Sequence, residues 1–158
     1  MHALARNTRP VHVADTRING LLGRWLSERK ELLTRYWSLS EAMKAANGAS
    51  ASAVRGRLDR FCEVLVDYVS AGHFEVFREL IEQYERQADA SGEEATALYR
   101  LILPTTHVAL DFNDRYFRGG SGAGFARDLS HLGQVLASRF DWEDALIRGL
   151  AGDTQHLR

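Results

Sequence analysis

The stretch between residues 18 and 39 carries the pattern that most restricts how this chain can fold. Its apolar positions recur at steps that alternate between four and three residues, the heptad spacing of a helix that packs along one side in a bundle. The positions in this stripe are Ile18, Leu22, Trp25, Arg29, Leu32, Tyr36 and Leu39. A long helix with one apolar stripe needs partner helices, so the sequence predicts an all-α fold, an antiparallel helical bundle.

Further helical stripes follow, over about residues 53–70, 73–87, 93–116 and 125–150. Only two prolines occur, and runs of alternating β-branched residues are absent, which favours long helices. The sequence therefore predicts four to five helices, with the fourth kinked or broken at Pro104. The predicted core positions of these later helices are Phe61, Cys62, Leu65, Val69, Phe74, Phe77, Leu80, Ile81, Tyr84, Leu98, Ile102, Thr105, Ala109, Phe112, Tyr116, Phe125, Leu129, Leu132, Leu136, Phe140 and Ile147.

A corner is predicted between the second and third of these helices. Gly72 can adopt the left-handed conformation that ends a helix, so we expect the helix over 53–70 to stop there. The corner would gather three polar side chains, those of Asp67, Ser70 and His73, beside an apolar stripe.

Length and composition limit the class of protein. A chain of 158 residues predicts one domain over 1–158, with residues 1–14 and 151–158 as mobile ends. The net charge of −1 gives no overall attraction to nucleic acid, and the single cysteine excludes an internal disulfide. No apolar run approaches the ~20 residues of a membrane span, and no secretory signal is visible. We therefore expect a cytoplasmic protein.

Residue types of metal and catalytic sites occur, but without the required spacing. A di-iron bundle site needs Glu-x-x-His on two helices, whereas the chain has Asp128-x-x-His131 and Asp153-x-x-His156. Asp67, Ser70 and His73 match the types of a hydrolytic triad, but no strand–turn–helix elbow holds the serine. The sequence predicts no metal ligand, no cofactor and no catalytic residue, and a metal-binding bundle enzyme remains a minor alternative.

The predicted third helix is acidic, because Glu75, Glu79, Glu82 and Glu85 recur at steps of three and four. This face repels phosphate, which argues against direct DNA binding through a helix-turn-helix. It suits a basic protein partner, such as a DNA-binding domain, although a plain solvated face has equal weight. Arg29 lies on an apolar stripe and needs an acid, and Asp67 is its predicted partner.

Four segments also carry a resemblance to a known family. Residues 59–81, which read DRFCEVLVDYVSAGHFEVFRELI, resemble the Rsd/AlgQ family of bacterial anti-sigma regulators, and DYVSAGHF is the most specific part. Residues 24–30 (RWLSERK), 110–115 (LDFNDR) and 139–147 (RFDWEDALI) are similar to other segments of that family. Together these segments follow the family's order along nearly the whole chain.

The resemblance implies a non-enzymatic helical protein that binds the primary sigma factor of RNA polymerase, at the C-terminal domain that reads promoter DNA. It further implies reduced use of that sigma factor in stationary phase, to the advantage of alternative sigma factors. The positions that match the family's binding surface are Arg24, Arg29, Asp67, Ser70 and His73. A regulatory adaptor for another protein, such as a phosphocarrier or a stress-signalling enzyme, stays open as an alternative.

Overall fold

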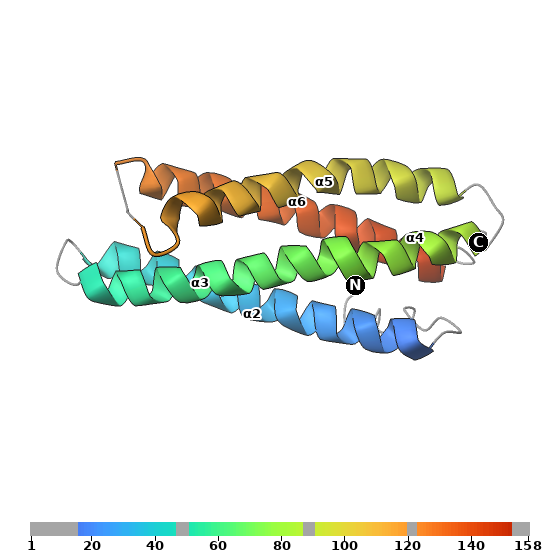
Figure 1. Ribbon diagram of the computed structural model, residues 1–158, viewed down its shortest axis with the longest axis horizontal. Helices are drawn as coiled ribbons and strands as arrows, with labels where there is room; N and C mark the ends of the chain where they lie inside the picture. Colours follow the sequence, from blue (N-terminus) through green and yellow to red (C-terminus); the bar gives the residue numbers. More distant parts are fainter. Residues whose placement is uncertain (1–15, 47–50, 87–90, 120–122, 153–158) are drawn as a thin grey trace.

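The computed structural model describes residues 16–46, 51–86, 91–119 and 123–152. This part of the chain contains helices and turns and no strand. The helices are α2 (Thr16–Ala46), α3 (Ala51–Ala71), the π-helix η1 (Gly72–Val76), α4 (Phe77–Arg86), α5 (Ser91–Tyr116) and α6 (Phe125–Gly152). Successive long helices run in opposite directions, with α2 packed on α3 and α5 packed on α6 (Figure 1). The predicted all-α antiparallel bundle is confirmed.

The ends of the chain were predicted to be mobile. Residues 1–14 and 153–158 lie outside the described residues, whereas Ala151 and Gly152 belong to α6.

The stripes predicted from helical spacing form one continuous core. Of the first stripe, Ile18, Leu22, Trp25, Leu32 and Leu39 are buried, and Tyr36 is partly buried against them. Each of the later helices also contributes, and the largest fully buried apolar side chains include Phe61, Leu65, Tyr68, Phe77 and Leu80. The side chain of Phe74, predicted for this core, lies outside the described residues.

Two glycines of α6 let tyrosines from other helices reach its backbone. A Cβ added at Gly133 would collide with the Tyr36 hydroxyl, and one at Gly149 would collide with the Tyr84 hydroxyl. These hydroxyls donate to the carbonyls of Leu129, at 3.0 Å, and Leu146, at 2.5 Å. The missing side chains therefore allow two hydrogen bonds that tie α2 and α4 to α6.

The corner predicted at Gly72 is wrong. α3, η1 and α4 follow one another along a continuous helical rod (Figure 1). Ala71, with φ −61° and ψ −43°, is right-handed, and the Phe77 N–H bonds the Gly72 carbonyl, five residues back as in a π-helix. Gly72 instead leaves space for two side chains, because an added Cβ would lie 3.1 Å from Trp25 Cζ2 and 3.2 Å from Arg139 Nη2, both tight contacts.

Pro104 does not break α5, which is helical from Ser91 to Tyr116. Proline removes one N–H, and with it the bond to the carbonyl four residues earlier, that of Arg100. Both residues are on the exposed side of the helix, so water can satisfy that carbonyl. Of the kink or break expected at Pro104, the break is therefore wrong, and the lost hydrogen bond lies on the side of α5 that faces solvent.

Candidate partner-binding site

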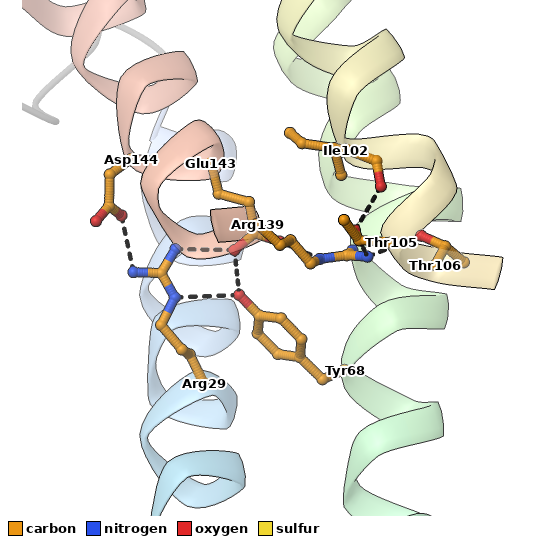
Figure 2. A network of polar contacts seen from close by, with 8 residues as sticks. All are labelled: Arg29, Tyr68, Ile102, Thr105, Thr106, Arg139, Glu143 and Asp144. Carbon is orange, nitrogen blue, oxygen red and sulfur yellow. Dashed lines mark hydrogen bonds and ion pairs between the residues drawn. The ribbon is translucent and has the colours of Figure 1, made fainter. Parts of the chain in front are cut away.

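A buried ion pair holds the middle of the bundle together. Arg139 and Glu143, one turn apart on α6, are both completely buried, and Arg139 Nε donates to Glu143 Oε2 at 2.7 Å. Arg139 Nη1 donates to the hydroxyls of Thr105 and Thr106 on α5, at 3.1 and 2.8 Å. Figure 2 shows this arginine bridging α6 to α5.

Arg29 brings α2 into the same network. Its Nη2 donates to Glu143 Oε1 at 2.9 Å, its Nη1 to Asp144 Oδ1 at 2.7 Å, and its Nε to the Tyr68 hydroxyl at 3.1 Å (Figure 2). The Tyr68 hydroxyl in turn donates to Glu143 Oε1 at 2.6 Å. Two arginines therefore face two carboxylates, so the charges cancel and each buried charge has a hydrogen-bonded partner.

The protonation states follow from these contacts. Burial lowers the pKa of Arg29, but Tyr68, Glu143 and Asp144 outweigh it, so the net pKa is above its usual value. Burial, followed by the neighbouring Glu143, raises the pKa of Tyr68 well above its usual value. The guanidinium therefore stays charged and the phenol stays protonated as a donor.

The predicted pairing of Arg29 with Asp67 is wrong. Arg29 points to α6, and its side chain is only 14% exposed, whereas Asp67 on α3 is exposed. Arg29 is thus a residue that ties helices together beneath the surface.

Within the described part of the chain, two buried donors near Gly72 have no hydrogen-bond acceptor. They are Trp25 Nε1 and Arg139 Nη2, and a Cβ on Gly72 would lie 3.2 Å from each. Aromatic rings surround both side chains: Trp25 stacks on Tyr68 with centroids 5.3 Å apart, and the Arg139 guanidinium lies 5.5 Å from the centroid of Phe77. The π-helix η1 therefore packs on a buried layer formed by Trp25, Tyr68, Phe77 and Arg139, which we call the floor under η1.

Above this floor, α2, α3 and η1 share a surface of charged residues. Burial raises the pKa of Glu28, Asp67 and Glu75 raise it further, and Arg24 lowers it. These effects place Glu28 within electrostatic range of both other carboxylates. We call Glu28, Asp67 and Glu75 the acidic face.

The structure brings together some of the sequence-predicted site residues. Arg24 and Asp67 are exposed: Asp67 belongs to the acidic face, and Arg24 is close enough to Glu28 to lower its pKa. Ser70 follows Asp67 on α3 and is half-buried. Arg29 belongs to the network below. The side chain of His73 lies outside the described residues.

Sequence reasoning missed Glu28, Glu143 and Asp144 as site residues, and it gave Glu75 only as part of an acidic helix. The spacing of Arg139 and Glu143 on a stripe with Leu136 and Phe140 could have revealed the buried pair. Nothing in the spacing shows that Glu28 faces α3 and η1.

None of the helices in the described ranges has the length and apolar character to cross a membrane. Within those same ranges, no three His, Cys, Asp or Glu side chains are grouped so as to hold a metal ion.

Comparison with known proteins gives a consistent result. Residues 5–151 match the family described as "Regulator of RNA polymerase sigma(70) subunit, Rsd/AlgQ". The chain is 33% identical to the "Regulator of sigma D" of Yersinia enterocolitica, over 87% of this chain and 84% of the relative. It is 34% identical to the protein of that name from an Enterobacter species, over 82% and 79%, and 32% identical to that of Salmonella paratyphi B, over 87% and 85%. The resemblance seen in the sequence is therefore confirmed, and the chain belongs to the Rsd/AlgQ family of regulators of the RNA polymerase sigma(70) subunit.

Proposed function

We propose that this protein is a non-enzymatic anti-sigma factor that binds the C-terminal, DNA-reading domain of the primary sigma factor. Family membership supports a role in sigma regulation, and the relatives carry the name "Regulator of sigma D". Covering the promoter-reading domain would reduce use of that sigma factor by RNA polymerase in the cytoplasm. Alternative sigma factors would gain access to the polymerase, as expected in stationary phase.

The acidic face is the observation that carries this proposal. A domain that reads promoter DNA needs basic side chains to contact phosphates, so its binding surface is complementary to carboxylates. Among the described residues, Asp67 and Glu75 form no ion pair, whereas Glu79 pairs with Arg17 at 2.8 Å and Glu82 with Arg86 at 3.6 Å. The unpaired carboxylates on α3 and η1 therefore offer the stronger attraction for a basic partner.

The roles proposed for the predicted site residues combine this geometry with the family resemblance, on which the role of His73 depends entirely. Asp67 would pair with a basic side chain of sigma, while Arg24, Ser70 and His73 would contact the partner around it. Arg29 would act as a positioning residue, because its bonds to Glu143 and Asp144 hold α2 against α6.

Titration calorimetry with the purified C-terminal domain of the primary sigma factor tests the proposal. We expect binding at modest salt, and a loss of about tenfold or more in affinity for Asp67→Ala, because one partner of a desolvated charge pair is removed. Asp67 is exposed, so the helical signal should not change. Asp111→Ala is the matched control, since it removes an exposed carboxylate from α5 and should leave affinity unchanged.

Two results would contradict the proposal. One is the absence of binding at about 50 µM of either protein, which is weaker than roughly −6 kcal/mol. The other is equal affinity of Asp67→Ala and the parent chain, which would remove the acidic face from the interface.

A further inference from the structure

α2 carries a second stripe, on the side away from the core. Its members recur at steps of four, three, four, four and three residues, so they lie along one helix face. They are Leu26, Lys30, Leu33, Trp37, Glu41 and Lys44, and we call them the outer stripe. Leu33 is 48% exposed and Trp37 is 65% exposed, two of the three large apolar side chains exposed in the described part of the chain.

This exposure is unusual for a tryptophan, which is ordinarily largely buried. Lys44 Nζ lies 5.9 Å from the centroid of the Trp37 ring, but a single cation does not cover an indole. In Figure 1, α2 forms an edge of the bundle and packs chiefly on α3. Among the described residues, no helix covers the side of α2 that carries the outer stripe, and tryptophan is among the residues enriched at the energetic centres of protein interfaces.

The order of charges along the outer stripe is complementary to itself. In an antiparallel contact between two copies of α2, about a two-fold axis near residue 35, positions whose numbers sum to about 70 face one another. Leu33 of one copy then faces Trp37 of the other, and Lys30 faces Glu41. Within its own helix the Glu41 carboxylate lies 3.6 Å from Lys44 Nζ, so Lys30 of the other copy would be a second cation on the same carboxylate. A parallel contact would oppose Lys30 to Lys30 and Lys44 to Lys44. Opposite charges meet only in the antiparallel arrangement.

We propose that the outer stripe is the contact surface of an antiparallel two-fold homodimer of this protein. Two Leu33–Trp37 contacts form its centre, and two Lys30–Glu41 ion pairs flank it. One helix per protomer makes a small contact, below about 1,200 Å² in total, so the dimer is weak and depends on concentration.

This surface is distinct from the acidic face. At 100° per residue, Glu28 points roughly half a turn around α2 from Trp37. Dimerisation through the outer stripe therefore leaves the acidic face open, and the two interfaces can be tested separately.

Analytical ultracentrifugation of the purified chain alone, from about 5 to about 500 µM at low salt, tests the proposal. We expect a concentration-dependent monomer–dimer equilibrium. Trp37→Ala should raise the dimer dissociation constant by about tenfold or more, because it removes the centre of the contact. Leu101→Ala, which truncates the other exposed large apolar side chain, on α5, is the matched control and should have no effect.

A charge exchange tests the antiparallel register. Lys30→Glu and Glu41→Lys should each weaken the dimer about fivefold, because each places like charges opposite one another. The double variant Lys30→Glu/Glu41→Lys should return to within about twofold of the parent. All these side chains are exposed, so circular dichroism should show unchanged helicity. A monomer at every concentration, an unaffected Trp37→Ala, or a double variant as weak as the singles would each overturn the proposal.

Discussion

At Glu143, two arginines that differ in burial share one carboxylate. Arg139 is completely buried, while Arg29 retains 14% exposure, and each donates to a different oxygen of Glu143. Such a network adds little net stability over an apolar core of equal shape. Removing one partner nevertheless costs much free energy of folding, because the other partner remains as a buried charge without a counter-ion or water. The effect of the network is to fix which faces of α2, α5 and α6 meet.

The first prediction concerns Glu143→Gln. The variant keeps the shape but removes the negative charge, so Arg139 is left buried without a counter-ion. We expect the free energy of unfolding to fall by about 3–5 kcal/mol. Chemical denaturation measures this. Asp144→Asn is the control: its side chain is 34% exposed, and the loss should stay below about 1 kcal/mol. Equal losses for both variants would contradict the role assigned to burial.

The second prediction concerns Glu28, whose pKa is raised above its ordinary value by partial burial of this exposed side chain and then by Asp67 and Glu75. The folded state therefore holds this proton more tightly than the unfolded state, and stability is lost as pH rises through the folded pKa. Glu28→Gln should raise Tm relative to the parent at about pH 7 and change it little at about pH 4.

The same variant should weaken binding of the sigma domain about threefold, because a carboxylate that repels its neighbours attracts a basic partner. A Tm difference that does not change with pH would show that Glu28 does not experience the other two carboxylates. Higher stability together with weaker binding would mark the residue as one kept for function.

The residue-scale errors of the sequence reading have one cause. Helical spacing shows that Arg29 lies on a buried stripe. Because a buried arginine needs an acidic partner, the sequence predicts that Arg29 forms an ion pair. The choice among acids depends on which helix lies opposite, and Glu143 and Asp144 are more than a hundred positions away in the chain. Asp67 was chosen from an expected neighbour helix, and spacing along one helix cannot correct that choice.

At the scale of elements, the rod formed by α3, η1 and α4 shows what a glycine can mean. Composition alone favoured a helix end at Gly72, since glycine destabilises helix interiors by up to ~1 kcal/mol relative to alanine. The structure instead keeps the helix and uses the missing Cβ to admit Trp25 and Arg139. Whether a glycine ends a helix or leaves space for a neighbouring side chain depends on residues from other helices. The length of the rod therefore could not be predicted from the sequence, whereas its buried stripe could.

The third prediction is a comparison of two glycines on this rod. Gly56 has open space around its missing Cβ, so Gly56→Ala should stabilise the protein by about 0.5–1 kcal/mol through helix propensity. Gly72→Ala gains the same propensity, but its Cβ meets Trp25 and Arg139, both held by buried contacts. We expect a net destabilisation of about 1–3 kcal/mol from this overpacking.

Thermal unfolding of the two variants beside the parent checks the comparison. A Tm increase for Gly72→Ala equal to that of Gly56→Ala would show that Trp25 and Arg139 can move to accommodate the added Cβ, and that the glycine is not required for space.

At the scale of the whole molecule, the family resemblance and the heptad stripes supplied most of what could be known in advance. The stripes predicted an antiparallel bundle, because each amphipathic helix must bury one side. The family order supplied a function that no spacing in the chain encodes. Neither the stripes nor the family resemblance predicted the acidic face. Its residues come from α2, α3 and η1, so they form one surface only after the chain has folded.

The last prediction follows from the continuity of the core. Buried side chains from α2, α3, η1, α4, α5 and α6 belong to one cluster, and the Arg29–Glu143–Arg139 network crosses α2, α6 and α5 at its middle. Because no pair of helices can bury its stripe without the others, the bundle should unfold in one cooperative transition. Far-ultraviolet circular dichroism, which reports helix content, and near-ultraviolet dichroism, which reports packing of buried rings such as Trp25, should therefore give the same midpoint in denaturant. In Glu143→Gln both midpoints should fall together. A variant in which ring packing is lost while helices persist would show that the polar network holds a separable layer of the bundle.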